Sequence, residues 1–436
     1  MVERYAFRRS FLLYFAAMGK SYKWWLLAIL SATFFFNQAD RALFGLLTVP
    51  IQDDLGLTDV QIGAINTALF ATLAIVTPFA GALGDRFSRK WIVTLSLIGW
   101  SLFTLLTGLV GGFVGMMLFR SIAAGAGEAC YMPSALPLLA RHHRETRSIA
   151  LSVHQSMLYV GLFVSGALIG ALYLFLGSSW RNIFFLFGAL GLVLGISFVW
   201  ILKDGNRDSA DGPATRSSGI WESIKAFACC PSALLMTGGA TAIVAVNNAY
   251  LAWAPKFVMA KYSLSVGDAG TGTMTWHHAF ALGAIYLSGL LTDHFAGRWP
   301  RFRLGIQMSA LAFGAPAIMM FGLAPTPVMA WTAAALYGGA RGFFEANTHA
   351  SVFDVIESRY RSTACGLMAM CAFLVGSLSP LFLGFMGEHS KCAADPSGIS
   401  GFGLGFACLG AFYLAGAACM AIAFFKTFRR DRIANG

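Results

Sequence analysis

The feature that most constrains this chain is a pair of long apolar runs separated by a short basic turn. From Asn66 the sequence is almost uncharged for the length of a helix. It then passes through G-A-L-G-D-R-F-S-R-K at residues 81–90 and becomes apolar again at Trp91. A membrane span needs about 20 apolar residues, and basic side chains hold such turns in the cytoplasm. The stretch therefore predicts a hairpin of two membrane-spanning helices.

Composition extends this interpretation to the whole chain. Its 436 residues are 57% hydrophobic and only 12% charged, whereas about 25% of the residues in soluble domains are charged. By the length criterion we expect twelve spans. They fall near residues 24–49, 59–83, 91–111, 113–139, 148–175, 181–202, 232–257, 267–291, 303–323, 327–353, 362–387 and 402–425. The fold class that follows is an all-α membrane protein with twelve transmembrane helices.

The position of the basic residues decides what the net charge of +11 means. They lie in alternate short loops and at the two ends of the chain, which is the pattern that orients membrane helices. This argues against a nucleic-acid partner. We expect a multi-pass protein of the cell (inner) membrane with both termini in the cytoplasm, and a monomer by default.

An internal repeat divides the chain into two halves. The 81–90 stretch has a degenerate echo at 289–298, an offset of 289 − 81 = 208 residues. Arg120 and Arg341 are offset by 341 − 120 = 221 residues, and Glu128 and Glu345 by 345 − 128 = 217. We predict an N-terminal six-helix bundle with a cytoplasmic N-terminal segment (1–202), a cytoplasmic linker (203–231) and a C-terminal six-helix bundle (232–436). Sites in such duplicated folds lie between the halves.

Six ionisable residues fall inside predicted spans, where each costs a few kcal/mol. They are Asp40 and Arg41 in the first span, Arg120 and Glu128 in the fourth, and Arg341 and Glu345 in the tenth. At ~1.5 Å per residue, Asp40 and Arg120 lie at similar depth, so they can meet. We expect a cavity lined by these groups; the alternative is ion pairs that only lock the helices together.

Other polar side chains in the spans are candidates for the same cavity. They are His154, Asn247, Trp253, His277 and Asn347. The alternative for each is a hydrogen bond between helices, which intramembrane Asn and His commonly make. The His277-His278 pair has no further ligand three or four residues away, so we expect no metal site and no cofactor.

The 81–90 stretch resembles the signature loop between helices 2 and 3 of the major facilitator superfamily. Asp40-Arg41, Gly127-Glu128-Ala129 with Pro133, and Trp180-Arg181 are similar to its Spinster-type and anion:cation symporter-type branches. This resemblance implies two pseudo-symmetric six-helix bundles that alternate access to a central site. It also implies a conformational gating loop made by Gly81, Gly84, Asp85, Arg86 and Arg89, with Asp293 and Arg298 in the repeat.

The same resemblance implies that Asp40 and Glu128 carry protons and that Arg41 and Arg120 bind an anion or pair with the acids. Arg120 and Glu128 are eight residues apart here, where seven is usual. One extra residue turns a helical side chain by about 100°. Arg120 would then not point where its counterparts do.

We therefore expect a proton-coupled secondary active transporter of a small organic anion. The predicted substrate-binding residues are Arg41, Arg120, Arg341, Glu345, Asn347, His154, Asn247, Trp253 and His277. The alternative is a Spinster-like transporter of lysophospholipid or another amphipathic lipid. A membrane sensor or intramembrane enzyme is a third class, which the absence of phosphate-binding, zinc-protease and nucleophile motifs disfavours.

Overall fold

The computed structural model describes residues 22–143, 145–203 and 220–432, apart from the side chains of residues 82, 84–86, 148, 220 and 362. The predicted N-terminal cytoplasmic segment, residues 1–21, lies outside this part, as do residues 204–219 of the predicted linker. In the described part the regular secondary structure is helical, apart from one isolated bridge between Cys392 and Asp395.

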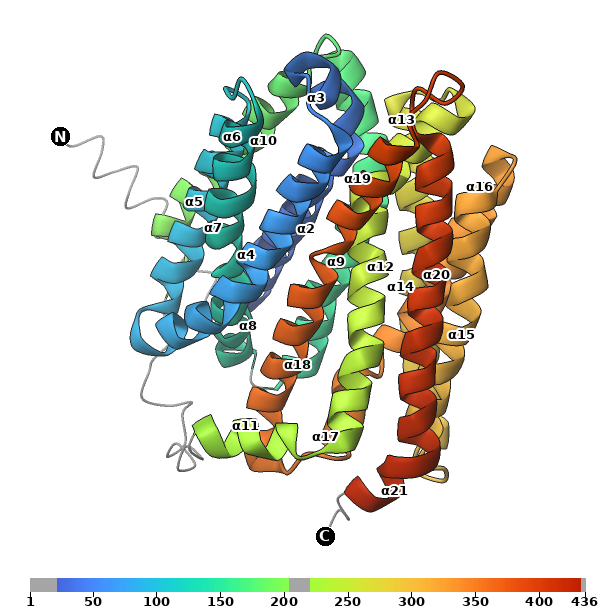
Figure 1. The fold of residues 1–436 in the computed structure, drawn as a ribbon. Coiled ribbons are helices and arrows are strands. Elements are labelled where there is room, and N and C mark those ends of the chain that lie inside the picture. Colours follow the sequence, from blue (N-terminus) through green and yellow to red (C-terminus); the bar gives the residue numbers. More distant parts are fainter. Residues whose placement is uncertain (1–21, 144, 204–219, 433–436) are drawn as a thin grey trace, which may run out of the picture.

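The N-terminal half contains six membrane-length segments, and Figure 1 shows their arrangement. The first three are α2 (Tyr22–Leu46) with the short helix α3 (Thr48–Leu55), α4 (Asp59–Arg86) and α5 (Arg89–Thr107). The fourth segment is made of four consecutive pieces, α6 (Phe113–Met116), η1 (Met117–Ala123), α7 (Ala124–Ala129) and α8 (Tyr131–His142). The last two are α9 (Arg147–Phe175) and α10 (Trp180–Ile201). Local signals fix their ends. Thr58 and Gln61 form a reciprocal capping box at the start of α4, and Gly56 ends α3 with a φ of 61°.

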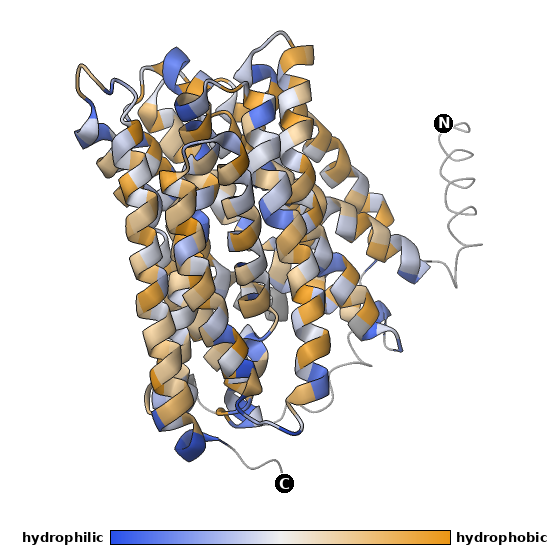
Figure 2. Cartoon of the chain, turned by 90° about the vertical axis from the view of Figure 1, so that its right-hand side faces the viewer, coloured by the Kyte–Doolittle hydropathy of each residue, from blue (hydrophilic) through white to orange (hydrophobic). Residues whose placement is uncertain are grey.

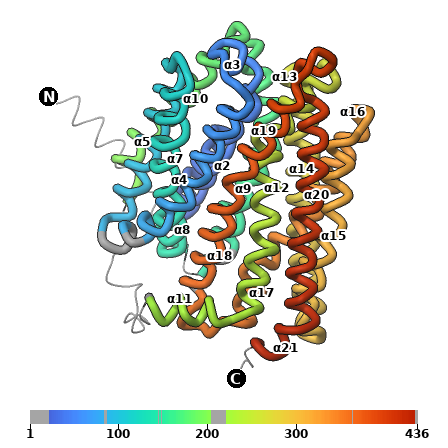
Figure 3. Tube along the Cα trace, in the orientation of Figure 1, coloured from blue at the N-terminus to red at the C-terminus, as the bar shows by residue number. Residues whose placement is uncertain are grey.

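The C-terminal half repeats this arrangement after α11 (Ile220–Ala228). The first three segments are α12 (Pro231–Tyr262), the combination of α13 (Val266–Gly270), η3 (Thr271–Thr275) and α14 (Trp276–Phe295), and α15 (Phe302–Leu323). The fourth is α16 (Pro327–Glu345), which is followed by the short helices α17 (Thr348–Phe353) and η4 (Ser358–Tyr360). The fifth consists of α18 (Arg361–Gly376) and α19 (Ser379–Ser390), and the sixth of α20 (Ile399–Ile422), η5 (Ala423–Thr427) and α21 (Phe428–Asp431). Part of the predicted linker is thus a helix. The tube in Figure 3 shows α11 lying across the end of the bundle.

Hydropathy along these segments is that of a membrane protein. Figure 2 shows hydrophobic residues along the middle of the helices and hydrophilic ones concentrated at the two ends. Within the described residues, 9 helices are long and apolar enough to cross a membrane. The other three membrane-length segments begin at Tyr22, Val266 and Pro327, and they are the ones that carry Asp40, His277 and Arg341. Their low hydropathy reflects polar side chains directed into the protein.

We call the end where α2 begins and α21 ends the proximal end, and the opposite end, where α3 lies, the distal end (Figure 1). The halves touch most closely in the distal part. A Cβ atom at Gly166 of α9 would overlap the backbone carbonyl of Gly270, and one at Gly45 of α2 would overlap that of Leu251. Only glycine allows backbones to approach this closely. The distal part of the interface between the halves is therefore closed.

Candidate functional site

A cavity of about 590 Å³ lies between the two halves. Its polar lining includes, from the N-terminal half, Gln38, Arg41, Ser152, Gln155, Ser156 and Tyr159, and from the C-terminal half Asn247, Asn248, Tyr286, Arg341, Glu345, Thr348 and His349. Exposure of the lining residues rises toward the proximal end. Gln38 and Asn248 are only 2% and 1% exposed, whereas Ser152 and Gln155 are exposed. The cavity is accessible from the proximal side.

On the N-terminal side, Arg41 of α2 faces the cavity and pairs with Glu128 of α7. The Nε of Arg41 donates to Oε1 of Glu128 at 2.8 Å, and its terminal nitrogen contacts the same oxygen. The Arg41 side chain is 21% exposed and that of Glu128 is 8% exposed. The guanidinium thus stands between the carboxylate and the cavity.

On the C-terminal side, Arg341 is held by three groups. Its Nε donates to Oε1 of Glu345 at 2.8 Å, its Nη1 donates to Oδ1 of Asn247 at 2.6 Å, and the same Nη1 lies 3.3 Å from Nε2 of His277. The other carboxylate oxygen of Glu345 accepts a hydrogen bond from the hydroxyl of Tyr159, which belongs to α9 of the N-terminal half. A continuous polar chain therefore connects the two halves through the cavity wall.

Asp40 and Arg120 lie behind this wall, inside the N-terminal bundle. Nη1 of Arg120 is 3.1 Å from Oδ2 of Asp40, and Nη2 donates to the backbone carbonyls of Asp40 at 2.9 Å and Arg41 at 3.3 Å. Both side chains are almost fully buried, at 2% and 3% exposure. The contact between Asp40 and Arg120 is thus present, as their depths allowed, but neither residue lines the cavity. By its two backbone contacts Arg120 fixes the part of α2 from which Arg41 projects.

The eight-residue spacing between Arg120 and Glu128 has a structural explanation. Arg120 lies in η1, a π-helical segment of seven residues from Met117 to Ala123. A π turn accommodates one more residue than an α turn. The extra residue is therefore absorbed before Glu128, and the two side chains reach α2 from the same helix.

Two other predicted substrate-binding residues, His154 and Trp253, make contacts away from the cavity. His154 is buried, stacks on Phe34 at 4.8 Å between centroids, and its Nε2 lies 3.2 Å from the Tyr131 hydroxyl. Trp253 is buried and donates to the carbonyl of Pro380 at 2.8 Å. These contacts are helix-packing interactions.

Asn347 and His277 differ in their relation to the cavity. Asn347 is 1% exposed and bonds Ser288 and Thr292, each at 3.0 Å, so it connects the end of α16 to α14. His277 is fully buried, but its ring reaches Arg341 and packs at a tilt against the ring of Tyr250, with 4.8 Å between the centroids. It supports the guanidinium from behind without lining the cavity.

The residues of the predicted gating loop lie at the proximal end, far from the closed distal interface. A Cβ atom at Gly81 would meet nothing within 4 Å, so no described helix packs closely against Gly81 in this conformation. Asp293 and Arg298 are exposed. Arg89 is in the first turn of α5, and the side chains of Asp85 and Arg86, with position Gly84, lie outside the described part.

Sequence reasoning missed several cavity residues. Gln38, Ser156, Tyr159, Tyr286 and Thr348 all line the cavity, and the hydroxyls of Ser156 and Tyr286 lie 2.7 Å apart across the halves. A signal was present: Ser152, Gln155, Ser156 and Tyr159 follow the three- and four-residue spacing of one helix face.

A second polar group, the distal cluster, joins the halves at the distal end. It consists of Gln52, Asp59, Lys256, Glu388 and Lys391. The buried Asp59 carboxylate pairs with Lys256 of α12 and with Lys391 at 2.8 Å, and its backbone N–H donates to Glu388 at 2.8 Å. Partial burial lowers the pKa of the Lys391 amino group, but the hydrogen bonds to Asp59 and Glu388 outweigh this effect, so the pKa is raised overall. The distal cluster therefore connects the two halves at this end by ion pairs and hydrogen bonds.

Among the residues that the structure describes, no group of three or more His, Cys, Asp or Glu side chains could hold a metal ion. The polar groups that line the cavity are guanidinium, carboxylate, amide, hydroxyl and imidazole groups.

Comparison with known proteins agrees with this architecture. The sequence profile of the Major Facilitator Superfamily matches residues 29–380. An MFS-type efflux pump of Mycolicibacterium smegmatis is 27% identical over 426 residues, covering 95% of both chains. A hexuronate transporter of Bacillus subtilis is 25% identical over 368 residues, covering 81% of this chain and 85% of its own.

Among solved structures, a bacterial homologue of the human lysosomal transporter Spinster, in an inward-facing and unoccupied conformation, superposes with a TM-score of 0.83 at 21% identity. It covers 96% of this chain and all of its own. The twelve-helix fold predicted from the sequence is confirmed. The chain belongs to the major facilitator superfamily of membrane transporters.

Proposed function

We propose that this transporter moves a small organic anion across the membrane by alternating access, together with a proton. The observation that carries the proposal is that Arg41 and Arg341 face one cavity from opposite halves and that each is held by a glutamate. Guanidinium groups suit the planar recognition of carboxylate or phosphate. The hexuronate transporter named above, by its name, moves a carboxylate, which supports the anion class.

The pairing supplies a reason for proton coupling. Arg41 with Glu128 and Arg341 with Glu345 form two formally neutral pairs, so an anion arriving alone would have to compete with a carboxylate for its guanidinium. When a proton neutralises Glu128 or Glu345, the guanidinium is free to pair with the substrate. Proton and anion then bind with positive coupling, and linkage makes the effect reciprocal.

The connection between the halves gives the coupling a mechanical consequence. Tyr159 donates to Glu345 across the interface between the halves. A neutral carboxyl group accepts hydrogen bonds less strongly than a carboxylate. Protonation of Glu345 therefore weakens one attachment of α9 to α16 at the moment when Arg341 becomes available to the substrate, and both events bias which way the cavity opens.

Glu128 is a better candidate than Asp40 for the proton carrier. Glu128 contacts the cavity through Arg41, whereas Asp40 is enclosed with Arg120 inside the bundle. A carrier must exchange protons with water on each side in turn. We assign Asp40 and Arg120 to positioning α2, and the gating loop at 81–90 and its repeat at 289–298 to controlling the proximal end.

Orientation follows from the distribution of basic residues. We propose that the proximal end is cytoplasmic, that the protein lies in the cell (inner) membrane as a monomer, and that the conformation described here is open to the cytoplasm. The closed distal cluster and the glycine contacts at Gly45 and Gly166 support the last point.

The experiment is transport by the purified protein in liposomes, with a panel of organic acids tested by counterflow and by uptake driven by a pH gradient. Glu128→Gln is expected to keep counterflow and lose gradient-driven accumulation. Asp354→Asn is the matched control, since it breaks an ion pair with Arg303 that lies outside the cavity. Equal survival of both activities in Glu128→Gln would show that Glu128 is not the coupling group.

A second candidate, an amphipathic lipid with an anionic head, is favoured by one observation. One wall of the cavity, formed by α4, α12 and α18, is apolar, with Phe70, Val244, Met368 and Phe373 among its residues. Lysophospholipids in the same counterflow panel test this candidate. Exchange of lysolipid without exchange of any short organic acid would replace the first candidate by the second.

A further inference from the structure

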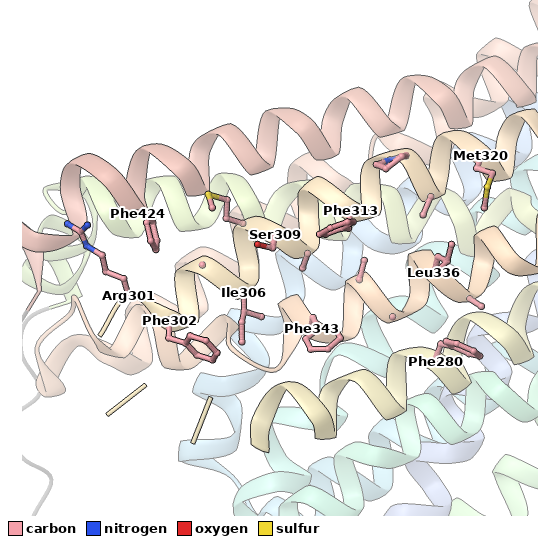
Figure 4. A pocket seen from close by; sticks show the side chains of 18 of the residues that line it. Phe280, Arg301, Phe302, Ile306, Ser309, Phe313, Met320, Leu336, Phe343 and Phe424 are labelled. Carbon is pink, nitrogen blue, oxygen red and sulfur yellow. The ribbon is translucent and has the colours of Figure 1, made fainter. Parts of the chain in front are cut away.

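A second hollow lies on the side of α16 that faces away from the central cavity. Its floor is made by small residues of α16, among them Ala335, Gly339 and Ala340, and its walls come from α14, α15 and η5. It has a volume of about 950 Å³. Figure 4 shows Arg301 and Phe424 at one end of this groove and Met320 at the other. We call it the α16 groove.

The α16 groove is open to the membrane. Three of the large apolar side chains that line it are among the exposed residues of the protein: Phe313 at 76%, Leu336 at 54% and Phe280 at 49% exposure. No segment of the described chain covers them, and in a membrane the medium beside them is hydrocarbon. From Arg301 to Phe313 along α15 is ~18 Å at ~1.5 Å per residue, about the thickness of one hydrocarbon leaflet.

The proximal end of the α16 groove is different in kind, because it carries a cation. Arg301 forms no ion pair among the described residues, and its guanidinium stands 5.5 Å over the ring of Phe424. The neighbouring Arg303, by contrast, is paired with Asp354 at 2.9 Å. Trp299, 55% exposed, lies beside Arg301 and lines the same end. An aromatic side chain and an unpaired arginine at this position are typical of the level of lipid headgroups.

We propose that the α16 groove binds one phospholipid of the proximal leaflet, with an acyl chain along Phe313 and Gly339 and an anionic phosphate headgroup at Arg301. The length of the groove, its apolar lining and Arg301, the one cation among the described residues that line it, all fit this occupant. Arg298 serves as an internal comparison, since it is exposed in the same loop but does not line the groove.

Native mass spectrometry of the purified full chain tests the proposal, with phosphatidylglycerol, phosphatidylcholine and oleate each added at the same concentration. One basic side chain near the surface contributes about a fivefold preference for anionic lipid. The wild-type protein is expected to retain one phosphatidylglycerol about fivefold more than phosphatidylcholine. Arg301→Gln is expected to abolish this preference, and Arg298→Gln to keep it.

A second pair of variants tests the acyl chain. A Cβ atom at Gly339 meets nothing within 4 Å, and neither does one at Gly283 of α14, which lies outside the groove. Gly339→Leu adds a side chain where the backbone borders open space in the groove, and it is expected to lose retention of both phospholipids, while Gly283→Leu keeps it. The proposal would be overturned if the wild type retained the two phospholipids equally or preferred oleate. It would also be overturned if Arg301→Gln kept the preference for phosphatidylglycerol, or if Gly339→Leu kept its retention of both phospholipids.

Discussion

Replacing Asp59 by Asn tests whether the distal cluster holds the transporter closed. The Asp59 side chain is fully buried, and it neutralises Lys256, which is 12% exposed, and Lys391, which is 32% exposed. Removing one partner of a buried ion pair costs about 3–5 kcal/mol. The exposure of Lys391 and the hydrogen bonds that Asn retains reduce this to about 2–3 kcal/mol. Since Lys256 and Lys391 belong to the other half, this energy stabilises only the distal-closed state.

Such a shift raises the population of the distal-open state by a factor of ~30 to 150. The population of the distal-open state can be measured by cysteine labelling. In a chain without its eight native cysteines, Ala369→Cys places one thiol in the cavity wall. The rate at which a membrane-impermeant maleimide, added from the distal side, labels this thiol reports the distal-open population. Asp54→Asn is the control, because Asp54 pairs with Arg181 at the same end but within one half. A labelling rate in Asp59→Asn within threefold of the parent would refute the reasoning.

Three further predictions rest on single contacts. Gly166→Ala places a methyl group against the carbonyl of Gly270, and overpacking of this kind costs about 1–3 kcal/mol. The substitution should therefore favour the distal-open state and raise the labelling rate in the same assay, whereas Gly283→Ala should leave the rate unchanged. Tyr159→Phe removes the hydrogen bond to Glu345 and should accelerate exchange between states by ~10-fold, which single-molecule distance measurements across the halves would detect. The folded-state pKa of Lys391 is raised, so its stabilisation of the distal-closed state is fully present below its ordinary pKa of about 10.4. The labelling rate of Ala369→Cys, divided by that of a free thiol at the same pH to remove thiol ionisation, should therefore not rise between pH 6 and pH 9. A rise in this ratio that Lys391→Gln abolishes would contradict the prediction.

Hydropathy, charge in the loops and the internal repeat were sufficient to predict the twelve helices, because these signals are local in the sequence. The partners of the ionisable groups were not predictable to the same degree. Arg41 and Glu128 are 87 residues apart, and their pairing depends on how α2 packs against α7. The π-helical segment that places Arg120 has no sequence signature other than an unusual spacing. Trp253 and His154 were indistinguishable from cavity residues, since burial against Pro380 and Phe34 is a tertiary property.

The repeat that relates Arg120 to Arg341 does not make the two residues equivalent. Arg120 is enclosed with Asp40, whereas Arg341 faces the cavity and Glu345 beside it is 28% exposed. On the N-terminal side the cavity-facing guanidinium is instead that of Arg41, which comes from a different helix of the bundle. The repeat therefore describes the architecture, whereas the cavity-facing groups come from different positions in the two halves.

This asymmetry predicts opposite consequences for one substitution at the two related positions. Arg120→Gln leaves the Asp40 carboxylate buried without its cation, at a cost of about 3–5 kcal/mol, so the thermal midpoint of the purified protein should fall clearly. Arg341→Gln leaves Glu345 in contact with cavity water, so the midpoint should change little while counterflow of the anion is lost. If the two variants lost stability and counterflow in equal measure, the division into a positioning arginine and a substrate-binding arginine would be wrong, and the repeat would describe the site as well as the fold.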